Sequence, residues 1–149
     1  MTLVEYLGLG LKDDAVLELL ERYDIEVIYR FDRLHENTPD EYTAAARGAG
    51  FELCFDEQQV LQTIFCYAAP RDGFAAVDPA IVGAPFFKTP ADAKTAAAQG
   101  GSDLQYNDGM EFLGRRLSWV SFELGKHKRH YEYSPKTLSL VTLSLAKPG

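Results

Sequence analysis

Two stretches decide the fold of this chain: FELCFDEQQVLQTIFCY at residues 51–67 and RHYEYSPKTLSLVTLSL at residues 129–145. Each alternates apolar and polar residues, is interrupted by a polar turn and then alternates again, which is the pattern of a β-hairpin. The two stretches lie about 78 positions apart, and at the same offset Asp14 matches Asp92 at the start of a helical pattern. The sequence therefore predicts two copies of one unit, at residues 1–78 and 79–149.

Each predicted unit begins with a helix and continues with about three antiparallel strands. Residues 12–23 have apolar side chains at helical spacing, and in the second unit Thr89 and Pro90 begin a helix that stops at Gly100. The predicted strands are residues 25–31, 51–55, 60–67, 119–124, 128–133 and 138–145, whereas residues 42–47 fit a strand or a helix. Residues 68–89 are predicted to form an ordered connection. We expect an α+β fold in which two tandem helix-plus-antiparallel-meander units form one sheet layer, with the helices packed on one face.

Length and hydropathy predict a single domain. A chain of 149 residues that is 46% hydrophobic can bury one continuous core without disulfides or metal ions. Glu5 interrupts the first segment where a secretory signal requires a basic start and an apolar run, and no apolar run approaches the roughly 18 residues that span a bilayer. We therefore expect a cytoplasmic protein that does not enter a membrane.

The negative charge is concentrated in the first quarter of the chain. Residues 1–41 contain eleven acidic and four basic residues, whereas the remaining residues contain eleven of each. Such a region repels nucleic acid and attracts a basic protein. The acidic residues that we expect to pair with Lys or Arg of such a partner are Asp13, Asp14, Asp24, Glu26 and Asp32. The basic stretch at residues 125–130 either meets phosphate or lies at a hairpin turn, and its spacing favours the turn.

No catalytic or metal-binding motif is found in the sequence. Cys54 and Cys66 lack CxxC spacing and a nearby histidine, so we expect free thiols. Nucleophile elbows, zinc-protease motifs, phosphate-binding loops and dinucleotide-binding glycine motifs are missing. We expect no cofactor, no metal ion and no enzymatic activity.

Tyr131 and Tyr133 share one face of a predicted strand, and Glu132 points to the other. A single sheet with helices on one side leaves its second face open, where aromatic side chains with neighbouring acids serve as anchors for a protein partner. The alternation does not say which face is open. Both alternatives therefore stand: the two tyrosines contact a partner, or they are buried in the core.

The recurring helix-plus-meander unit, with its FELCF strand and closing VTLSL strand, resembles the tandem-repeat fold of the beta-lactamase inhibitor protein and of small outer-membrane assembly lipoproteins. The stretch WVSFELGKHKRHYEYSPKTLSLVTL is also similar to the closing portion of bacterial toxin-immunity proteins. The inhibitor has a disulfide in each half and the lipoproteins have a lipidated cysteine, features that this chain lacks. The resemblance implies a fold and a binding role without assigning site residues.

The leading hypothesis is a small protein-binding inhibitor, an immunity protein that neutralises a basic bacterial toxin, present as a monomer or a homodimer. The alternative hypothesis is a small-ligand-binding protein or small enzyme with a pocket between sheet and helices. The groups available to such a pocket are Cys54, His127, His130, Arg115 and Arg116.

Overall fold

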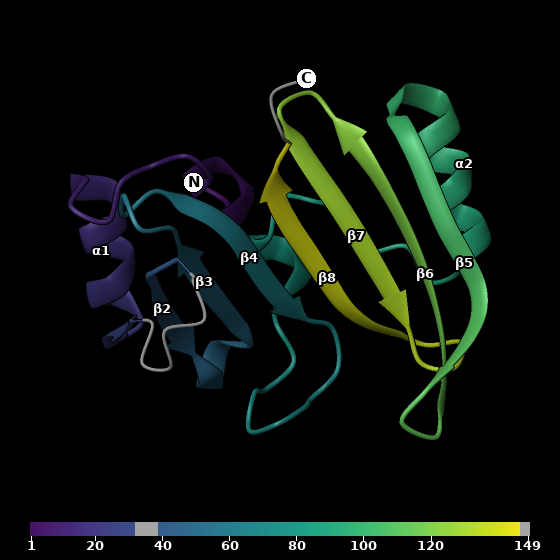
Figure 1. Cartoon of the computed structure of the whole chain (residues 1–149), viewed down its shortest axis with the longest axis horizontal. Helices are drawn as coiled ribbons and strands as arrows, with labels where there is room; N and C mark the ends of the chain where they lie inside the picture. Colours follow the sequence, from purple (N-terminus) through teal and green to yellow (C-terminus); the bar gives the residue numbers. More distant parts are fainter. Residues whose placement is uncertain (32–38, 147–149) are drawn as a thin grey trace.

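One antiparallel sheet of eight strands forms the framework of the protein (Figure 1). The computed structural model describes residues 1–31 and 39–146. The strands follow one another across the sheet in the order β1-β2-β3-β4-β8-β7-β6-β5. Their bounds are Val27–Arg30 (β1), Glu41–Ala46 (β2), Phe51–Phe55 (β3), Leu61–Tyr67 (β4), Ser102–Phe112 (β5), Arg115–Leu124 (β6), His127–Tyr133 (β7) and Leu138–Leu145 (β8).

Residues 51–67 and 129–145 form the hairpins β3–β4 and β7–β8, as predicted. These hairpins lie next to each other because β4 pairs with β8, with Cys66 opposite Val141 and Phe65 opposite Thr142. Figure 1 shows β4 and β8 side by side in the middle of the sheet. The predicted α+β class, with a single antiparallel sheet, is therefore confirmed.

Four strands follow each helix, where the sequence predicted about three. In the first half, the ambiguous residues 42–47 belong mainly to β2. In the second half, β5 was not predicted, because its eleven residues do not alternate and its pairing with β6 shifts register twice, between Ser102 and Gln105 and between Asn107 and Met110. Such bulges break the period of two from which a strand is recognised.

Helices α1 (Asp14–Arg22) and α2 (Pro90–Gly100) pack on the same face of the sheet, as predicted. The register places one row of side chains on this face across six neighbouring strands: Ala46, Phe51, Cys66, Val141, Tyr131 and Val120. Tyr23, at the end of α1, contacts Phe51 edge to face, with ring centroids 5.2 Å apart. At the end of α2, Gly101 lies directly over Phe122. We call this side of the sheet the helix face.

The later part of the connection between β4 and α2, from Val82 to Thr89, runs over the helix face and is held by both halves of the chain. The Val82 carbonyl accepts a hydrogen bond from the Val4 amide at 3.0 Å. Farther along, the Tyr131 hydroxyl donates to the Pro85 carbonyl at 3.0 Å. The helix face is thus covered at its centre as well as under the two helices. Within the described ranges, no helix has the length and apolar character to cross a membrane.

Candidate functional site

The other side of the sheet carries neither α1 nor α2, and we call it the open face. The pairing of the strands aligns its side chains in three rows. The rows are Asn107, Trp119, Glu132, Leu140 and Tyr67; Gln105, Ser121, His130, Thr142, Phe65 and Glu52; and Glu123, Lys128, Ser144, Thr63, Cys54 and Thr43. They run from β5 or β6 across the middle of the sheet, so both hairpins contribute to one surface.

Four partly buried rings, Trp119, His130, Phe65 and Tyr67, occupy the centre of the open face. Trp119 stacks on His130, with ring centroids 5.3 Å apart and planes at 29°. Tyr67 stacks on Phe74 at 4.3 Å, and Phe74 follows β4 in the chain. These contacts orient Trp119, His130 and Tyr67, which reduces the side-chain entropy that these three rings lose when another molecule covers them. We call these residues the four open-face rings.

Charged side chains border the rings. The Arg71 guanidinium lies 3.7 Å from the Glu132 carboxylate and 5.6 Å from the centre of the Tyr67 ring. Its Nε atom is buried and has no hydrogen-bond partner among the described residues. The guanidinium also lies 3.7 Å from the Asp72 carboxylate, so two acidic neighbours, Asp72 and Glu132, balance its positive charge.

Burial determines the protonation of the groups that could do chemistry here. It lowers the pKa of His130, an effect that Lys128 strengthens and Glu132 opposes, so the imidazole is neutral near pH 7. Burial, with a smaller contribution from the Glu52 carboxylate, raises the pKa of the Cys54 thiol to about 12. The thiol is therefore protonated and a poor nucleophile. The open face is suited to binding more than to covalent chemistry.

The expectation that Tyr131 and Tyr133 are exposed anchors is wrong, and the alternative of burial holds. Both side chains are 0% exposed and lie on the helix face. Tyr133 donates its hydroxyl to the carbonyls of Phe87 and Thr89, at 2.8 and 3.1 Å. Burial raises the pKa of Tyr131 to about 12 and also raises that of Tyr133. The rings on the open face have the opposite parity: His130 lies on the same strand as the two tyrosines, and Trp119 lies on the neighbouring strand β6.

The predicted acidic residues lie apart from the four open-face rings. Asp13, Asp14, Asp24 and Glu26 are all exposed and lie at or near the two ends of α1, which is on the opposite side of the molecule from β6 (Figure 1). Asp13 also accepts a hydrogen bond from the Gly10 amide at 2.8 Å, which stabilises the turn before the helix. Asp32 lies outside the described residues. The acids form an exposed patch around α1, separate from the aromatic centre on β4, β6 and β7.

The basic stretch at residues 125–130 begins at a hairpin turn, as the sequence favoured. Gly125 has φ of 65° between β6 and β7, and the following residues belong to β7. Lys128 and His130 project from the open face, whereas Arg129 shares the helix face with Tyr131. Burial and the neighbouring Arg129 and Lys126 charges lower the pKa of His127. The stretch divides between two faces and does not form a single cationic patch.

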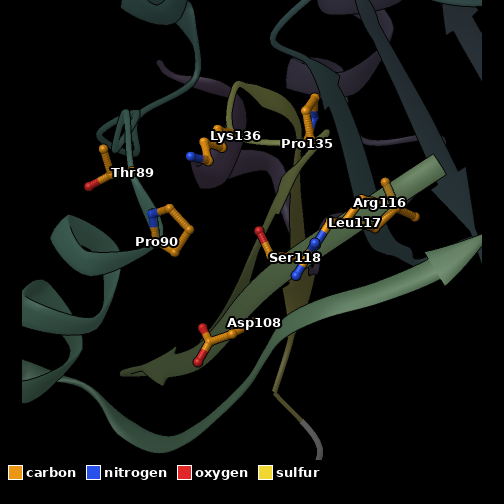
Figure 2. A pocket seen from close by; sticks show the side chains of 8 residues that line it. All are labelled: Thr89, Pro90, Asp108, Arg116, Leu117, Ser118, Pro135 and Lys136. Carbon is orange, nitrogen blue, oxygen red and sulfur yellow. The ribbon is translucent and has the colours of Figure 1, made fainter.

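A pocket of about 530 Å³ lies on the helix face, beside the start of α2 (Figure 2). It is lined by Thr89, Pro90, Asp108, Arg116, Leu117, Ser118, Pro135 and Lys136. Arg116 was among the groups expected to serve a small-ligand pocket. Within the described part of the chain, neither Arg116 nor Lys136 forms an ion pair, whereas the Asp108 carboxylate binds the Lys94 ammonium at 2.8 Å. The pocket is therefore locally cationic.

Cys54 and His130 lie on the open face, so they do not join Arg116 in this pocket. No cluster of three or more His, Cys, Asp or Glu side chains suited to a metal ion occurs in residues 1–31 and 39–146. Comparison of the chain with protein-family models, with curated proteins and with solved structures finds no match.

Proposed function

We propose that this protein is a binding protein that inhibits another protein by covering it with the open face of its sheet. The observation that carries the proposal is the set of four partly buried rings, in two adjacent rows, on the face that the helices leave free. Tryptophan, tyrosine and arginine are the side chains most enriched at the energetic centres of protein interfaces. Trp119, Tyr67 and Arg71 together provide such a centre, with Glu132 and Glu52 beside it.

We infer that the partner is basic and that the protein acts as an immunity protein against a bacterial toxin in the cytoplasm. The acidic patch around α1 supports a basic partner, because charges outside the contact region accelerate the encounter without joining the interface. The resemblance of the C-terminal part of the sequence to toxin-immunity proteins supports the biological role. In this proposal the acids steer the encounter and the four open-face rings supply the affinity.

We further propose that the two halves, residues 1–78 and 79–149, are copies of one unit. The support is the element order: a helix precedes four strands in each half, and the strand order reads symmetrically from the β4–β8 pair toward either edge. A duplicated unit joined in this way yields one wide sheet. Both copies then contribute to the binding surface, Phe65 and Tyr67 from the first and Trp119 and His130 from the second.

To test the proposal, immobilised wild-type protein captures its partner from a lysate of the source organism. A variant substituted away from the open face, Leu17→Ala, serves as the matched control. Captured proteins are identified by mass spectrometry, and the purified partner is titrated by calorimetry against wild type, Trp119→Ala and Leu17→Ala. Leu17 is 47% exposed on α1, so its truncation changes an exposed apolar residue on the other side of the molecule. We expect Trp119→Ala to weaken binding by about 30-fold or more and Leu17→Ala to have no effect.

Equal affinity of wild type and Trp119→Ala for the partner would show that the open face is not the binding surface. The inhibitory role is tested separately by co-expression. If the captured partner is a toxin, its expression alone stops growth, and co-expression of this chain restores it. A partner whose expression is harmless would contradict the immunity role while leaving the binding surface intact.

A second candidate function is binding of a small anionic ligand in the pocket beside α2. It is favoured by the two cationic side chains, Arg116 and Lys136, that face a cavity of about 530 Å³ without an acidic partner among the described residues. The probes are phosphate, citrate and a panel of carboxylate metabolites in a thermal-shift assay. A ligand of this site raises the Tm of wild type in proportion to its excess over Kd, and raises that of Arg116→Ala less.

A further inference from the structure

The two edge strands of the sheet, β1 and β5, differ in how they meet solvent. Edge strands present unpaired backbone groups that accept another strand, and bulges or charged residues normally prevent this. β5 has two register shifts and a residue with positive φ, Asp103 at 52°. By contrast, β1 pairs with β2 without any register shift and carries Ile28 and Tyr29, whose side chains are 53% and 48% exposed. The β1 edge therefore lacks the bulges that interrupt the β5 edge.

The residues that form this edge, EVIYR at 26–30, are complementary to themselves in antiparallel orientation. When two copies pair about Ile28, each Ile28 lies opposite its counterpart and each Val27 opposite a Tyr29. Glu26 of one copy then lies opposite Arg30 of the other, at both ends of the pair. Opposite charges and large apolar side chains in directly opposed positions stabilise strand pairing, whereas like charges destabilise it.

The side chains at this edge are already oriented by neighbours on β2 and in the turn before it. Tyr29 stacks on Tyr42 with ring centroids 5.0 Å apart and donates its hydroxyl to the Asp40 carboxylate at 2.7 Å. Arg30 lies opposite Glu41 in the β1–β2 register. In a pair of copies, Arg30 would therefore lie between Glu41 of its own chain and Glu26 of the second copy, an environment in which its charge is neutralised on both sides.

We propose that this protein forms a symmetric homodimer by antiparallel pairing of β1 with β1 of a second copy, centred on Ile28. The twofold axis of such a pair is perpendicular to the sheet. The two sheets join into one continuous sheet of sixteen strands, twice the eight of each copy. Both open faces then point to the same side, and the dimer presents two copies of the aromatic surface to a partner. This proposal is independent of what the open face binds.

The test is the mass of the protein in solution as a function of its concentration, measured by sedimentation and light scattering in 150 mM salt. This salt concentration screens the repulsion between the acidic patches of the two copies, since the Debye length is about 8 Å. A chain of 16.6 kDa should give twice that mass at high concentration. A mass of one chain at every concentration up to the solubility limit overturns the proposal.

Charge exchange then tests the register. Glu26→Arg alone and Arg30→Glu alone each place like charges opposite one another at both ends of the pair, so each should raise the dimer Kd by about tenfold or more. The double variant Glu26→Arg/Arg30→Glu restores both ion pairs and should recover most of the affinity. A double variant that dimerises no better than either single variant rules out this register.

A matched pair of substitutions distinguishes the two edges. Ile28→Lys on β1 should abolish the dimer, and Leu104→Lys on β5, where the leucine is 41% exposed, should leave it intact. Both side chains are exposed, so neither change disturbs the core, and the Tm of each monomer confirms folding. Loss of the dimer in Leu104→Lys, with Ile28→Lys still dimeric, assigns the interface to the other edge and overturns the proposal.

Discussion

Trp119 lies against His130 on adjacent strands of the open face, with ring centroids 5.3 Å apart and planes 29° from parallel. This contact joins β6 to β7 on the side of the sheet that the helices do not cover. It also places an ionisable ring at the centre of the proposed binding surface. The pair therefore links the stability of the fold to pH and to partner binding.

Stability should fall as the pH is lowered from 7.5 to 5. Burial lowers the pKa of His130 in the folded protein below its ordinary value near 6.5, which is the value in the unfolded chain. Between these two pKa values the imidazole is protonated more in the unfolded chain than in the folded protein, so acid favours unfolding. Stability is then highest above about pH 6.5 and is lost as the pH falls toward the folded pKa. His130→Gln, which cannot be protonated, should lose less stability over this interval. Urea unfolding at both pH values measures the difference, and equal losses in the two proteins would contradict the assignment.

Tyr133→Phe should destabilise the fold by about 1–3 kcal/mol, because it leaves the carbonyls of Phe87 and Thr89 without their buried donor. Tyr29→Phe removes a hydroxyl of the same type from an exposed pair with Asp40 and should change stability by less than about 0.5 kcal/mol. Urea unfolding of both variants provides the comparison. If the two substitutions cost the same, the hydrogen bonds of Tyr133 do not hold the connection on the helix face.

Gly50→Ala should be far more damaging than Gly125→Ala or Gly48→Ala. Gly50 has φ of 78°, and a Cβ atom there would collide with the backbone of Ala75 and Val77. The left-handed conformation and the collision together should cost about 2–4 kcal/mol. Gly125→Ala meets the conformational cost alone, about 1 kcal/mol, since its Cβ atom would contact nothing within 4 Å. Gly48→Ala, with neither problem, should be close to neutral in thermal unfolding.

Both thiols should react slowly with iodoacetamide at pH 8 in the native protein. Burial raises the pKa of Cys54 and of Cys66 to about 12, so little thiolate is present. Cys66 is 0% exposed and should react only on unfolding, whereas Cys54 is partly exposed on the open face and should react first. Mass spectrometry of timed samples gives the two rates, with Cys54→Ser as the control for assignment. Rapid labelling of Cys66 would show that the hairpin β3–β4 opens more readily than its burial indicates.

The hairpins could be predicted because apolar alternation is a local property. The alternation is unbroken in residues 51–55 and shifts once in residues 138–145, at Leu140 and Val141. The strands observed at both places have the predicted bounds. The strand at residues 102–112 was not predicted. An edge strand whose two faces are both largely exposed does not need alternating apolar residues, and this alternation is the pattern from which strands are recognised. Asp103, Gln105 and Asp108 are polar and exposed, which in sequence looks like a loop.

The candidate site could be predicted only in part, because alternation separates two faces without saying which is covered. The choice depends on residues far away in the chain. The carbonyls that accept the hydroxyl hydrogen bonds of Tyr131 and Tyr133 belong to residues 44 to 46 positions away, at Pro85, Phe87 and Thr89. The sequence does contain one indication of the open face: in the observed register, Trp119 and His130 point to the side opposite Tyr131 and Tyr133. This relation can be recognised only once the pairing of β6 with β7 is known.

The acidic patch leads to a prediction about rate. If the acids around α1 steer a basic partner, a charge there affects association more than the same charge at the far edge of the sheet. Asp14→Lys and Glu111→Lys both replace an exposed acid and both change the net charge from −7 to −5. Asp14 begins α1, whereas Glu111 lies in β5 at the opposite end of the molecule (Figure 1).

Stopped-flow measurements of association with the captured partner should give a lower rate for Asp14→Lys than for Glu111→Lys. The association rate of Asp14→Lys should also depend less on salt concentration, and the dissociation rates of both variants should change little. Equal association rates for the two variants would mean that only the net charge matters, and the patch would then have no directional role.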